Sequence, residues 1–545
     1  MKLFADPGRA DSQARTRSAQ DGGTSLRVRL VVFAALWIAA GVEPISAATL
    51  RFNVLDEHGK NTAARFFLLV NQVPWYPNHG TKNCLRFVSY HDSKRQLSVM
   101  TYATGKGTAE IKLPNSVESV HLGLVKGFEY RPIRKDFGKQ ELEKVHVIQL
   151  DRWSHLEAEG WLSADAHLHY DRFSKRADPM WFTMMQGDDL GSAHFMYLIG
   201  GKVPGEWAVQ YAYGKKGEAS DGQRLITAGL EYRDGMQGHI NLLGMPEIVQ
   251  PVMAGRGGLP NYPTLDSVLR RTSKRGGLPV VAHGGSLGGS ATVILDGILG
   301  SPDAIEIGNS HLYSLDNWYR LMNAGFFQPP VAGTDLPNFP ERDGWQPFLG
   351  GMRMYAYTGK KRDFASWKSA VKAGRVMISS GPILKFRVGG QMVGSTIRIP
   401  KPMEIVVDGL LESPQGVNQL ELIRNGKPVE VPVLSSGKTC LSFRHSLKIA
   451  QSCWLAARGR GAEIQALLRA KLPPTPFHNH HAIAHSGIIR VIVGDQPIAT
   501  AAARQELAAQ LRVQKELYEK RGRYDTPAQK NEMLNLFERA LDRLE

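Results

Sequence analysis

Short apolar segments alternate with helical segments from about residue 160 to residue 382, and this alternation constrains the fold more than any other feature of the sequence. In the clearest unit, residues 265–274 have helical periodicity, Gly276 and Gly277 end the helix, and the apolar strand 278–282 leads into His283. Chains in which strands and helices take turns form sheets covered by helices, either open or closed. We therefore expect an α/β layer or barrel at the centre of the chain.

Regions of β patterning flank this central part. Because 545 residues are too many for one compact core, several domains are expected. Short alternating stretches bounded by turn-rich segments predict strands on both sides of the centre. Near the end of the chain, Thr526 and Pro527 are placed as N-cap and first helical residue. We predict a β-sandwich module over 49–155, a β/α domain over 156–382, a β-rich module over 383–496 and a helical tail over 497–545.

Residues 1–48 have the pattern of a signal peptide. Residues 1–29 are polar and basic, an apolar run follows over 30–42, and Ser46-Ala47-Ala48 offers small residues for cleavage. A membrane span needs about 20 apolar residues, which is longer than this run. No other stretch is apolar enough to cross a bilayer. We expect export to the periplasm or the extracellular space, with no membrane span left after cleavage.

The formal net charge of +16 raises the question of nucleic-acid binding. The basic residues are scattered, and no stripe of interleaved aromatic residues or recognition motif accompanies them, so no nucleic-acid partner is predicted. A basic surface on an exported protein instead favours an anionic small-molecule or polymer substrate. The sequence carries no signal for an oligomeric state.

Three cysteines remain after the predicted cleavage: Cys84, Cys440 and Cys453. An odd number argues against a disulfide scaffold. Cys440 and Cys453 lie on neighbouring predicted strands, so two interpretations stay open. Either they pair in an oxidising compartment, or they are small buried apolar residues.

Metal-binding residue types gather where predicted strands begin and end. Two histidines stand two residues apart on an extended segment, which directs both imidazoles to the same side. Three other residues follow apolar strands, and one opens a strand. Imidazole is a common ligand of zinc and similar divalent ions, and strand-end residues of a β/α barrel converge at one rim. The pattern predicts one metal centre built from His167, His169, Glu231, His239, His283 and Asp335.

Some of these residues also have purely structural interpretations. His283 is compatible with a core histidine, Asp335 with a helix N-cap or turn residue, and Glu231 with an ion pair to Arg233. Each interpretation explains one residue and leaves the arrangement of the others unexplained. The metal centre is therefore the hypothesis that accounts for the set.

A competing motif is the segment Gly284-Gly285-Ser286-Leu287-Gly288, which matches the nucleophile elbow of serine hydrolases. That fold needs an acid and a histidine downstream of the serine, and Asp335 and His485 would have to fill these roles. This hypothesis leaves the two neighbouring histidines of the opening segment without a function.

Residues 160–169 read GWLSADAHLH, and the segments 229–232, 238–244, 280–283 and 332–335 follow in order. As an ordered set these motifs resemble PHP-domain metallohydrolases, most closely the carbaryl-hydrolase-like (CehA/McbA) branch. Residues 373–376 and 380–382 resemble the stretch with which that branch leaves its catalytic domain. The resemblance covers about residues 155–390.

The resemblance implies a distorted β/α barrel of seven strands that holds two or three divalent ions. His167 and His169 would bind a first ion, Glu231 would bridge, His239 and His283 would bind a second ion, and Asp335 would close the site. The sequence departs from the family where Asp-His is usual, and Asp188, Asp189 or His194 are the candidates to substitute there. Leu336-Pro337 stand where a further histidine is usual, so one or two ions are expected.

The combined prediction is a PHP-like barrel flanked by β-sandwich modules, acting as an exported metal-dependent hydrolase of ester, phosphoester or carbamate bonds. The pattern does not distinguish zinc, manganese and iron. Asp188 or His311 could shuttle protons. Two alternatives stay open: a catalytically degenerate scaffold that binds an envelope glycan or polymer, and a serine hydrolase using Ser286.

Overall fold

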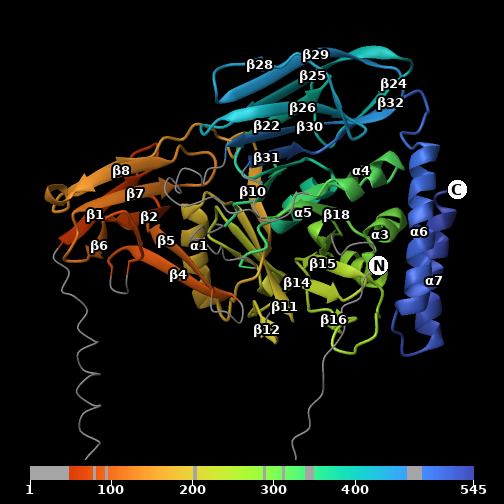
Figure 1. Ribbon diagram of the computed structural model, residues 1–545, viewed down its shortest axis with the longest axis horizontal. Coiled ribbons are helices and arrows are strands. Elements are labelled where there is room, and N and C mark those ends of the chain that lie inside the picture. Colours follow the sequence, from red (N-terminus) through yellow and green to blue (C-terminus); the bar gives the residue numbers. More distant parts are fainter. Residues whose placement is uncertain are drawn as a thin grey trace, which may run out of the picture.

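The computed structural model describes residues 48–77, 81–91, 96–200, 205–285, 290–309, 314–337, 349–462 and 481–545. Apart from Ala48, the expected signal peptide lies outside these residues. Figure 1 shows an amino-terminal sheet-rich part, a central part of strands and helices, a second sheet-rich part and two helices along one edge. None of the helices in these residues combines the length and apolar character that crossing a bilayer requires.

The amino-terminal part consists of two sheets that share one core. Burial alternates along β1, as expected for a strand with one face on a core. Phe52, Phe66, Ile111 and Leu122 lie in that core. One sheet has the order β6–β1–β9, and the other has the order β4–β5–β2–β7–β8 with β3 paired to β2. The strands are β1 (Ala48–Leu55), β2 (Ala64–Val70), β3 (Val73–Trp75), β4 (Cys84–His91), β5 (Gln96–Ala103), β6 (Ala109–Leu113), β7 (Ser119–Val125), β8 (Ile133–Gly138) and β9 (Val145–Gln149).

Seven strands form a circuit of pairings in the central part. β10, β11 and β14 pair in parallel, β15 runs antiparallel between β14 and β17, and β17, β18 and β19 are again parallel. After β19 the chain returns to β10, because Asp335 N donates to His167 O at 2.8 Å and Leu168 bridges to Leu336. These strands are β10 (Trp161–Leu168), β11 (Ser192–Ile199), β14 (Leu225–Asp234), β15 (Gly238–Leu243), β17 (Leu278–Val281), β18 (Ala304–Gly308) and β19 (Pro330–Ala332).

Helices and short strands complete the central part. The predicted helix 265–274 is α2, and the predicted strand after it is β17. Thr264 caps α2 by accepting a hydrogen bond from Ser267 N at 3.3 Å. The helices are α1 (Asp178–Gly187), α2 (Leu265–Lys274), α3 (Val293–Leu299), α4 (Asp316–Asn323) and α5 (Phe364–Lys372); the short strands are β12 (Glu206–Trp207), β13 (Ala219–Ser220) and β16 (Met253–Ala254).

The pairing of β14 with β15 determines where Glu231 and His239 lie. Glu231 was expected to follow an apolar strand, but β14 continues to Asp234, so Glu231 lies inside it. The strand continues because its second half pairs with β15, from Gly229↔Leu243 to Asp234↔Gly238. Since β15 is antiparallel, its first residues lie at the edge where β14 ends, and His239 stands opposite Arg233.

The second sheet-rich part is joined to the centre through β20 (Arg353–Tyr357) and β21 (Val376–Ser379). β20 pairs with β10, and β21 pairs with both β20 and β31. Two sheets then enclose a core that contains Val407, Leu422 and Val491. Their strands are β22 (Ile383–Val388), β23 (Gln391–Met392), β24 (Thr396–Ile399), β25 (Met403–Glu412), β26 (Val417–Arg424), β27 (Lys427–Val429), β28 (Leu434–Ser435), β29 (Cys440–Ile449), β30 (Cys453–Ala462), β31 (His481–Ser486) and β32 (Ile489–Val493).

The cysteines are free in this structure. Cys440 and Cys453 begin β29 and β30, which are neighbours in sequence but belong to different sheets. Cys453 and Cys84 differ in environment, since Cys453 is buried and Cys84 is half-buried. The disulfide interpretation is therefore not realised here.

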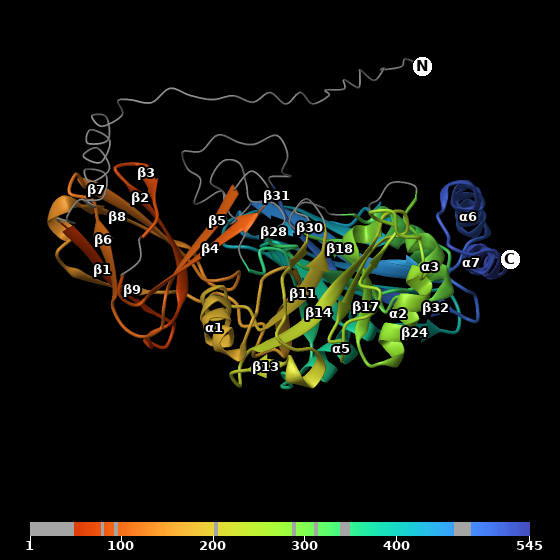
Figure 2. The ribbon, with the colours of Figure 1, turned by 90° about the horizontal axis from the view of Figure 1, so that it is seen from below.

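Two helices, α6 (Ala501–Arg521) and α7 (Pro527–Asp542), end the chain. Thr526 caps α7 as expected, accepting from Gln529 N at 3.3 Å. The buried face of α7 includes Met533, Phe537 and Ala540, together with side chains of the central core. Figure 2 shows both helices beside α3 at one edge of the molecule.

Candidate metal centre

His167 and His169 lie side by side at the end of β10. Their side chains are fully buried, and their Nε2 atoms are 3.0 Å apart. The other ring nitrogen of each histidine has a fixed partner: Nδ1 of His169 faces the carbonyl oxygen of Met196 at 3.0 Å, and Nδ1 of His167 faces Glu306 Oε1 at 2.9 Å. Partners of this kind orient the rings and direct both Nε2 atoms to one point.

Asp165 stands two residues before His167 and binds the segment after β19 that returns to β10. Its carboxylate accepts hydrogen bonds from Thr334 N, Thr334 Oγ1 and Gly350 N at 2.7–2.9 Å, and from His167 N at 3.2 Å. Burial raises the pKa of Asp165 to about 6, against the opposing effect of these hydrogen bonds. Asp165 therefore fixes the backbone that carries the site.

Glu231 lies at the centre of the histidines. Its oxygens are 3.2 Å from both His169 Nε2 and His239 Nδ1, and 3.8 Å from His283 Nε2. Arg233 contacts the same carboxylate at 2.6 Å, so the ion pair considered from the sequence is present as well. Burial alone would raise the pKa of Glu231, but Arg233 and the two histidines outweigh it and hold the pKa well below its ordinary value.

His283 and Asp335 complete the cluster from the ends of β17 and β19. Asp335 Oδ1 is 3.3 Å from His169 Nε2, and Asp335 Oδ2 is 3.4 Å from His283 Nε2. Both residues have positive φ angles, 55° for His283 and 56° for Asp335. Such backbone angles are unfavourable for residues other than glycine and concentrate at functional sites. The strained turns direct both side chains into the cluster.

The ionisation of the histidines reflects the surrounding carboxylates. Burial lowers the pKa of His169 and of His283, but Asp335 and Glu231 outweigh it and raise both values to about 9. For His239, burial prevails and lowers the pKa to about 4. When no metal ion is bound, protons on His169 and His283 therefore balance the negative charges of Asp335 and Glu231.

Three atoms of the metal-binding type are buried without a hydrogen bond of regular geometry among the described residues: Glu231 Oε1, His239 Nδ1 and His283 Nε2, although Glu231 Oε1 and His239 Nδ1 lie 3.2 Å apart. Buried polar atoms are nearly always satisfied in folded proteins, so three that face one another require an explanation. The same three residues form one of three groups whose ligand atoms lie within 4.8 Å of one another; the other groups are His167, His169 and Glu231, and His167, His283 and Glu306. Imidazole nitrogens with carboxylate oxygens fit one or two divalent ions.

All six residues that the sequence singled out therefore meet in one cluster. Glu306 and Asn241 were not anticipated. Glu306 contacts His167 and also accepts from His283 N at 2.7 Å, and Asn241 Nδ2 lies 3.0 Å from His167 Nδ1. The signal that could have found Glu306 is its position as an acid within the apolar strand β18, next to the strand that leads to His283.

The candidates for the missing Asp-His motif have other partners. Asp188 binds Arg65 at 3.1 Å, and Asp189 binds Arg152 at 2.9 Å. His194 contacts Ser192 and Thr227 and stacks near Trp367, with ring centroids 4.2 Å apart. None of the three belongs to a group of potential ligands within the described residues, so none substitutes for the motif.

Two further sequence hypotheses depend on residues outside the described ranges, namely Ser286 and His311. The remaining members of the supposed serine triad have separate partners. Nε2 of His485 lies 2.6 Å from the hydroxyl oxygen of Tyr319, and its Nδ1 lies 2.7 Å from Ser486 O. Asp335 instead faces the histidine cluster. These contacts do not favour a triad.

No family model matches the chain, and no curated protein matches it in sequence. Among solved structures, the chain is similar to the crystal structure of the novel lesion-specific endonuclease PfuEndoQ from Pyrococcus furiosus, with 13% identity and a TM-score of 0.26. The similarity covers 39% of this chain and 56% of that one. At this level it establishes neither a shared fold nor a shared activity.

Proposed function

We propose that this protein is an exported hydrolase that uses one or two divalent metal ions to cleave an ester, phosphoester or carbamate bond. The observation that carries the proposal is the meeting of Glu231, His239 and His283 through buried atoms that have no hydrogen bond of regular geometry among the described residues. A cation would satisfy all three atoms and replace the protons that the cluster otherwise holds. Zinc, manganese and iron all suit this donor set.

A divalent ion in such a site would supply a water of lowered pKa and a Lewis acid for the scissile group. The protein's own contribution is to keep the ligands ionised and oriented. Arg233 keeps Glu231 ionised, while Glu306 and Met196 O orient the two histidines of β10. Because these groups are buried, the reacting bond would be held away from bulk water.

We further propose that the circuit of seven strands from β10 to β19 is the distorted β/α barrel of a PHP-like domain of the carbaryl-hydrolase-like type. Its support is the order of the sequence motifs together with the gathering of the six residues at one edge of the circuit. Export is supported by the signal-peptide pattern of residues 1–48. The net charge of +16 supports an anionic substrate.

Metal analysis tests the proposal directly. The wild-type protein, loaded with zinc or manganese and desalted, should retain metal in stoichiometric amount. The double variant His167→Ala/His169→Ala should lose it, because the two Nε2 atoms are direct ligands in the proposal. His194→Ala is the matched control, since His194 is equally buried but lies outside the cluster. Equal metal content in the double variant and the wild type would exclude the proposed site.

A second candidate function is that of a catalytically inactive scaffold that binds a polymer. It is favoured by one observation: Asp188, Asp189 and His194 are engaged elsewhere and do not complete the usual ligand set. A screen of esters, phosphoesters and carbamates with added zinc or manganese separates the two functions. A scaffold would give no turnover under any metal, whereas the hydrolase would give turnover that chelators abolish.

A further inference from the structure

The candidate metal centre is least deeply buried on one side. Side chains of His167, His169 and Glu231 are fully buried, whereas those of His239 and His283 retain 11% and 16% of their exposure. The side formed by His239 and His283 is therefore the one nearest to solvent. Residues that flank these two histidines are the ones placed to recognise a substrate.

Arg256 flanks His239 on this side. One terminal nitrogen of its guanidinium lies 3.1 Å from His239 Nε2, and the residue is half-buried. No carboxylate within the described part of the chain forms an ion pair with it, in contrast to Arg233, which is committed to Glu231. Arg256 thus brings a partly desolvated cation, without an ion-pair partner in the described part of the chain, to the less buried side of the centre.

A guanidinium presents several N–H donors in one plane, which match a pair of anionic oxygens such as those of phosphate or carboxylate. We propose that Arg256 binds an anionic group of the substrate at the less buried side of the centre, and that Arg523, in the connector between α6 and α7, holds Arg256 in place. The proposal rests on the proposed function and deepens it. It assigns substrate recognition to a loop, and assigns a positioning role to a segment outside the region of family resemblance.

Arg523 holds the loop 255–261 at three points. Its guanidinium donates to Gly255 O at 2.6 Å. Its backbone exchanges two hydrogen bonds with Asn261: Arg523 N donates to Asn261 Oδ1 at 3.0 Å, and Asn261 N donates to Arg523 O at 2.8 Å. Gly255, which accepts the first of these hydrogen bonds, directly precedes Arg256. The connector therefore fixes both ends of the loop from which Arg256 projects.

The loop is also anchored from inside. Asn261 Nδ2 donates to Asp234 Oδ1 at 2.9 Å, and Asp234 ends β14, three residues beyond Glu231. Gly255 has a φ of 64°, and a Cβ added there would lie 2.3 Å from Asn261 Nδ2 and 2.7 Å from Asp234 Oδ2. The packing therefore leaves no room for a side chain at position 255.

The connector is itself firmly placed, because α6 and α7 are part of the central core. Leu511 and Phe537 are buried in that core. Tyr518 donates to Ser290 O at 2.5 Å, and Gln514 donates to Ala291 O at 3.1 Å. Figure 1 shows both helices running along the edge of the central part that carries β16, the strand just before the loop. Rigid helices thus carry the connector to the loop.

The decisive experiment measures binding of inorganic phosphate to the metal-loaded full-length protein by titration calorimetry, with acetate as a second probe. Arg256→Gln should weaken phosphate binding about tenfold or more, as expected for loss of a charge-assisted pair. Arg523→Gln should also weaken phosphate binding. Arg523→Lys can still donate to Gly255 O and should therefore bind phosphate more tightly than Arg523→Gln. The double variant should be no weaker than Arg256→Gln alone, because both residues act through one contact.

Arg543→Gln is the matched control. Arg543 also ties the carboxyl-terminal helices to a backbone carbonyl, that of Leu299 at 2.9 Å, but it does not contact the loop 255–261. Its phosphate affinity should equal that of the wild type. If acetate binding also depends on Arg256, the recognised group is any anionic oxygen pair; if only phosphate binding does, the site selects phosphate.

Metal content, measured on every variant, separates this inference from the proposed function. Full metal content with unchanged phosphate affinity in Arg256→Gln would overturn the role of Arg256. Additive losses in the double variant, or an equal loss in Arg543→Gln, would overturn the positioning role of Arg523. Absence of metal from the wild type would instead overturn the proposed function itself.

Discussion

Glu306 contacts two of the candidate metal ligands and fixes their orientation. It contacts the ring of His167 at 2.9 Å and the backbone of His283 at 2.7 Å. We predict that Glu306→Gln retains metal stoichiometry but binds the ion about 10–100-fold more weakly, as is typical when an orienting partner is lost. Competition with a chromogenic chelator measures this affinity. Glu231→Gln, which removes a direct ligand, should lose stoichiometric metal; equal behaviour of the two variants would contradict the assignment.

The protonated histidines predict how metal affinity depends on pH. The pKa values of His169 and His283 are raised to about 9, so the metal-free folded protein keeps protons on both rings through neutral pH. A metal ion must displace these protons, and its affinity should therefore rise as the pH increases from 6 towards 9 and level off above 9. Calorimetry in buffers of different ionisation enthalpy should detect proton release at pH 7. A pH-independent affinity without proton release would contradict this expectation.

At this scale the sequence predicted which residues gather in the cluster, for a physical reason. Five of the six residues stand at strand ends or beside turns, and such positions converge whenever neighbouring strands share an edge; Glu231 instead lies inside β14. Glu306 and Asn241 were not predicted because they lie within apolar strands. The sequence pattern of such a strand does not indicate which residues its side chains contact. Asp188 and His194 were plausible by spacing alone, but the partners that engage them, such as Arg65, are far away in sequence.

Strands β10 and β19 approach each other closely where the chain returns to β10. Gly333 follows β19, and a Cβ added there would lie 2.4 Å from His167 N and 2.6 Å from His167 Cβ. Gly333→Ala should therefore push the two segments apart, lower the metal content and destabilise the protein. Metal analysis and denaturant unfolding measure the two effects. Gly138→Ala is the control, because its added Cβ would meet only the end of the Glu141 side chain at 3.7 Å; equal behaviour would refute the close approach.

Elements with local signals were predictable, and those defined by their partners were not. The helix α2 and the strand β17 follow from their periodicity and from the two glycines between them. The full length of β14 did not follow, because its second half contains charged residues and becomes a strand only by pairing with β15. For the same reason, no local pattern indicated that β15 runs antiparallel, which is what brings His239 to the site.

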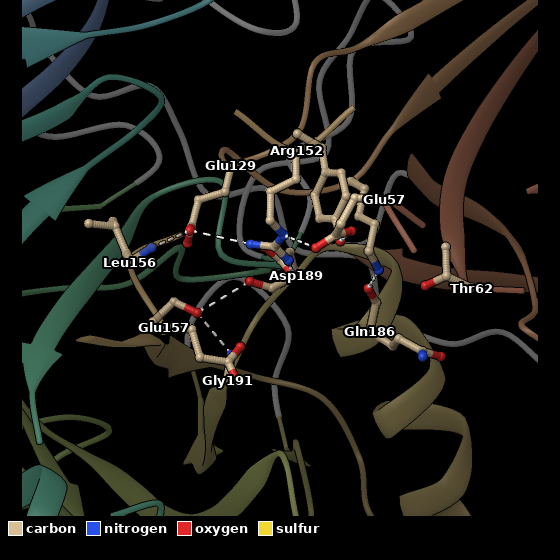
Figure 3. Close-up of polar contacts among 12 residues, drawn as sticks. Glu57, Thr62, Glu129, Arg152, Leu156, Glu157, Gln186, Asp189 and Gly191 are labelled. Carbon is tan, nitrogen blue, oxygen red and sulfur yellow. Dashed lines mark hydrogen bonds and ion pairs between the residues drawn. The ribbon is translucent and has the colours of Figure 1, made fainter. Parts of the chain in front are cut away.

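At the scale of the whole molecule, a half-buried ionic network around the buried Glu129 joins the amino-terminal sheets to the central part. Figure 3 shows Arg152 between three carboxylates. It lies 2.9 Å from Glu57, 3.3 Å from Glu129 and 2.9 Å from Asp189, the last of which follows α1 in the central part. Burial raises the pKa of Glu129 to about 8, with a further contribution from Asp189. Arg152 therefore balances the negative charge of carboxylates from both parts of the molecule.

We predict that Arg152→Ala destabilises the protein by up to about 3–5 kcal/mol, because it leaves the buried Glu129 and two half-buried carboxylates facing one another without a cation. Denaturant unfolding measures the loss, and the amino-terminal sandwich should unfold in a separate transition once its ionic link is gone. Arg131→Ala is the matched control: Arg131 pairs with Asp151 at 2.9 Å, but both side chains are more than half exposed, and a surface pair contributes about 1 kcal/mol or less. Metal content should stay the same in both variants, since neither arginine contacts the histidine cluster. Equal stability losses would show that the network does not couple the two parts, and a loss of metal would show that the sandwich is needed to form the centre.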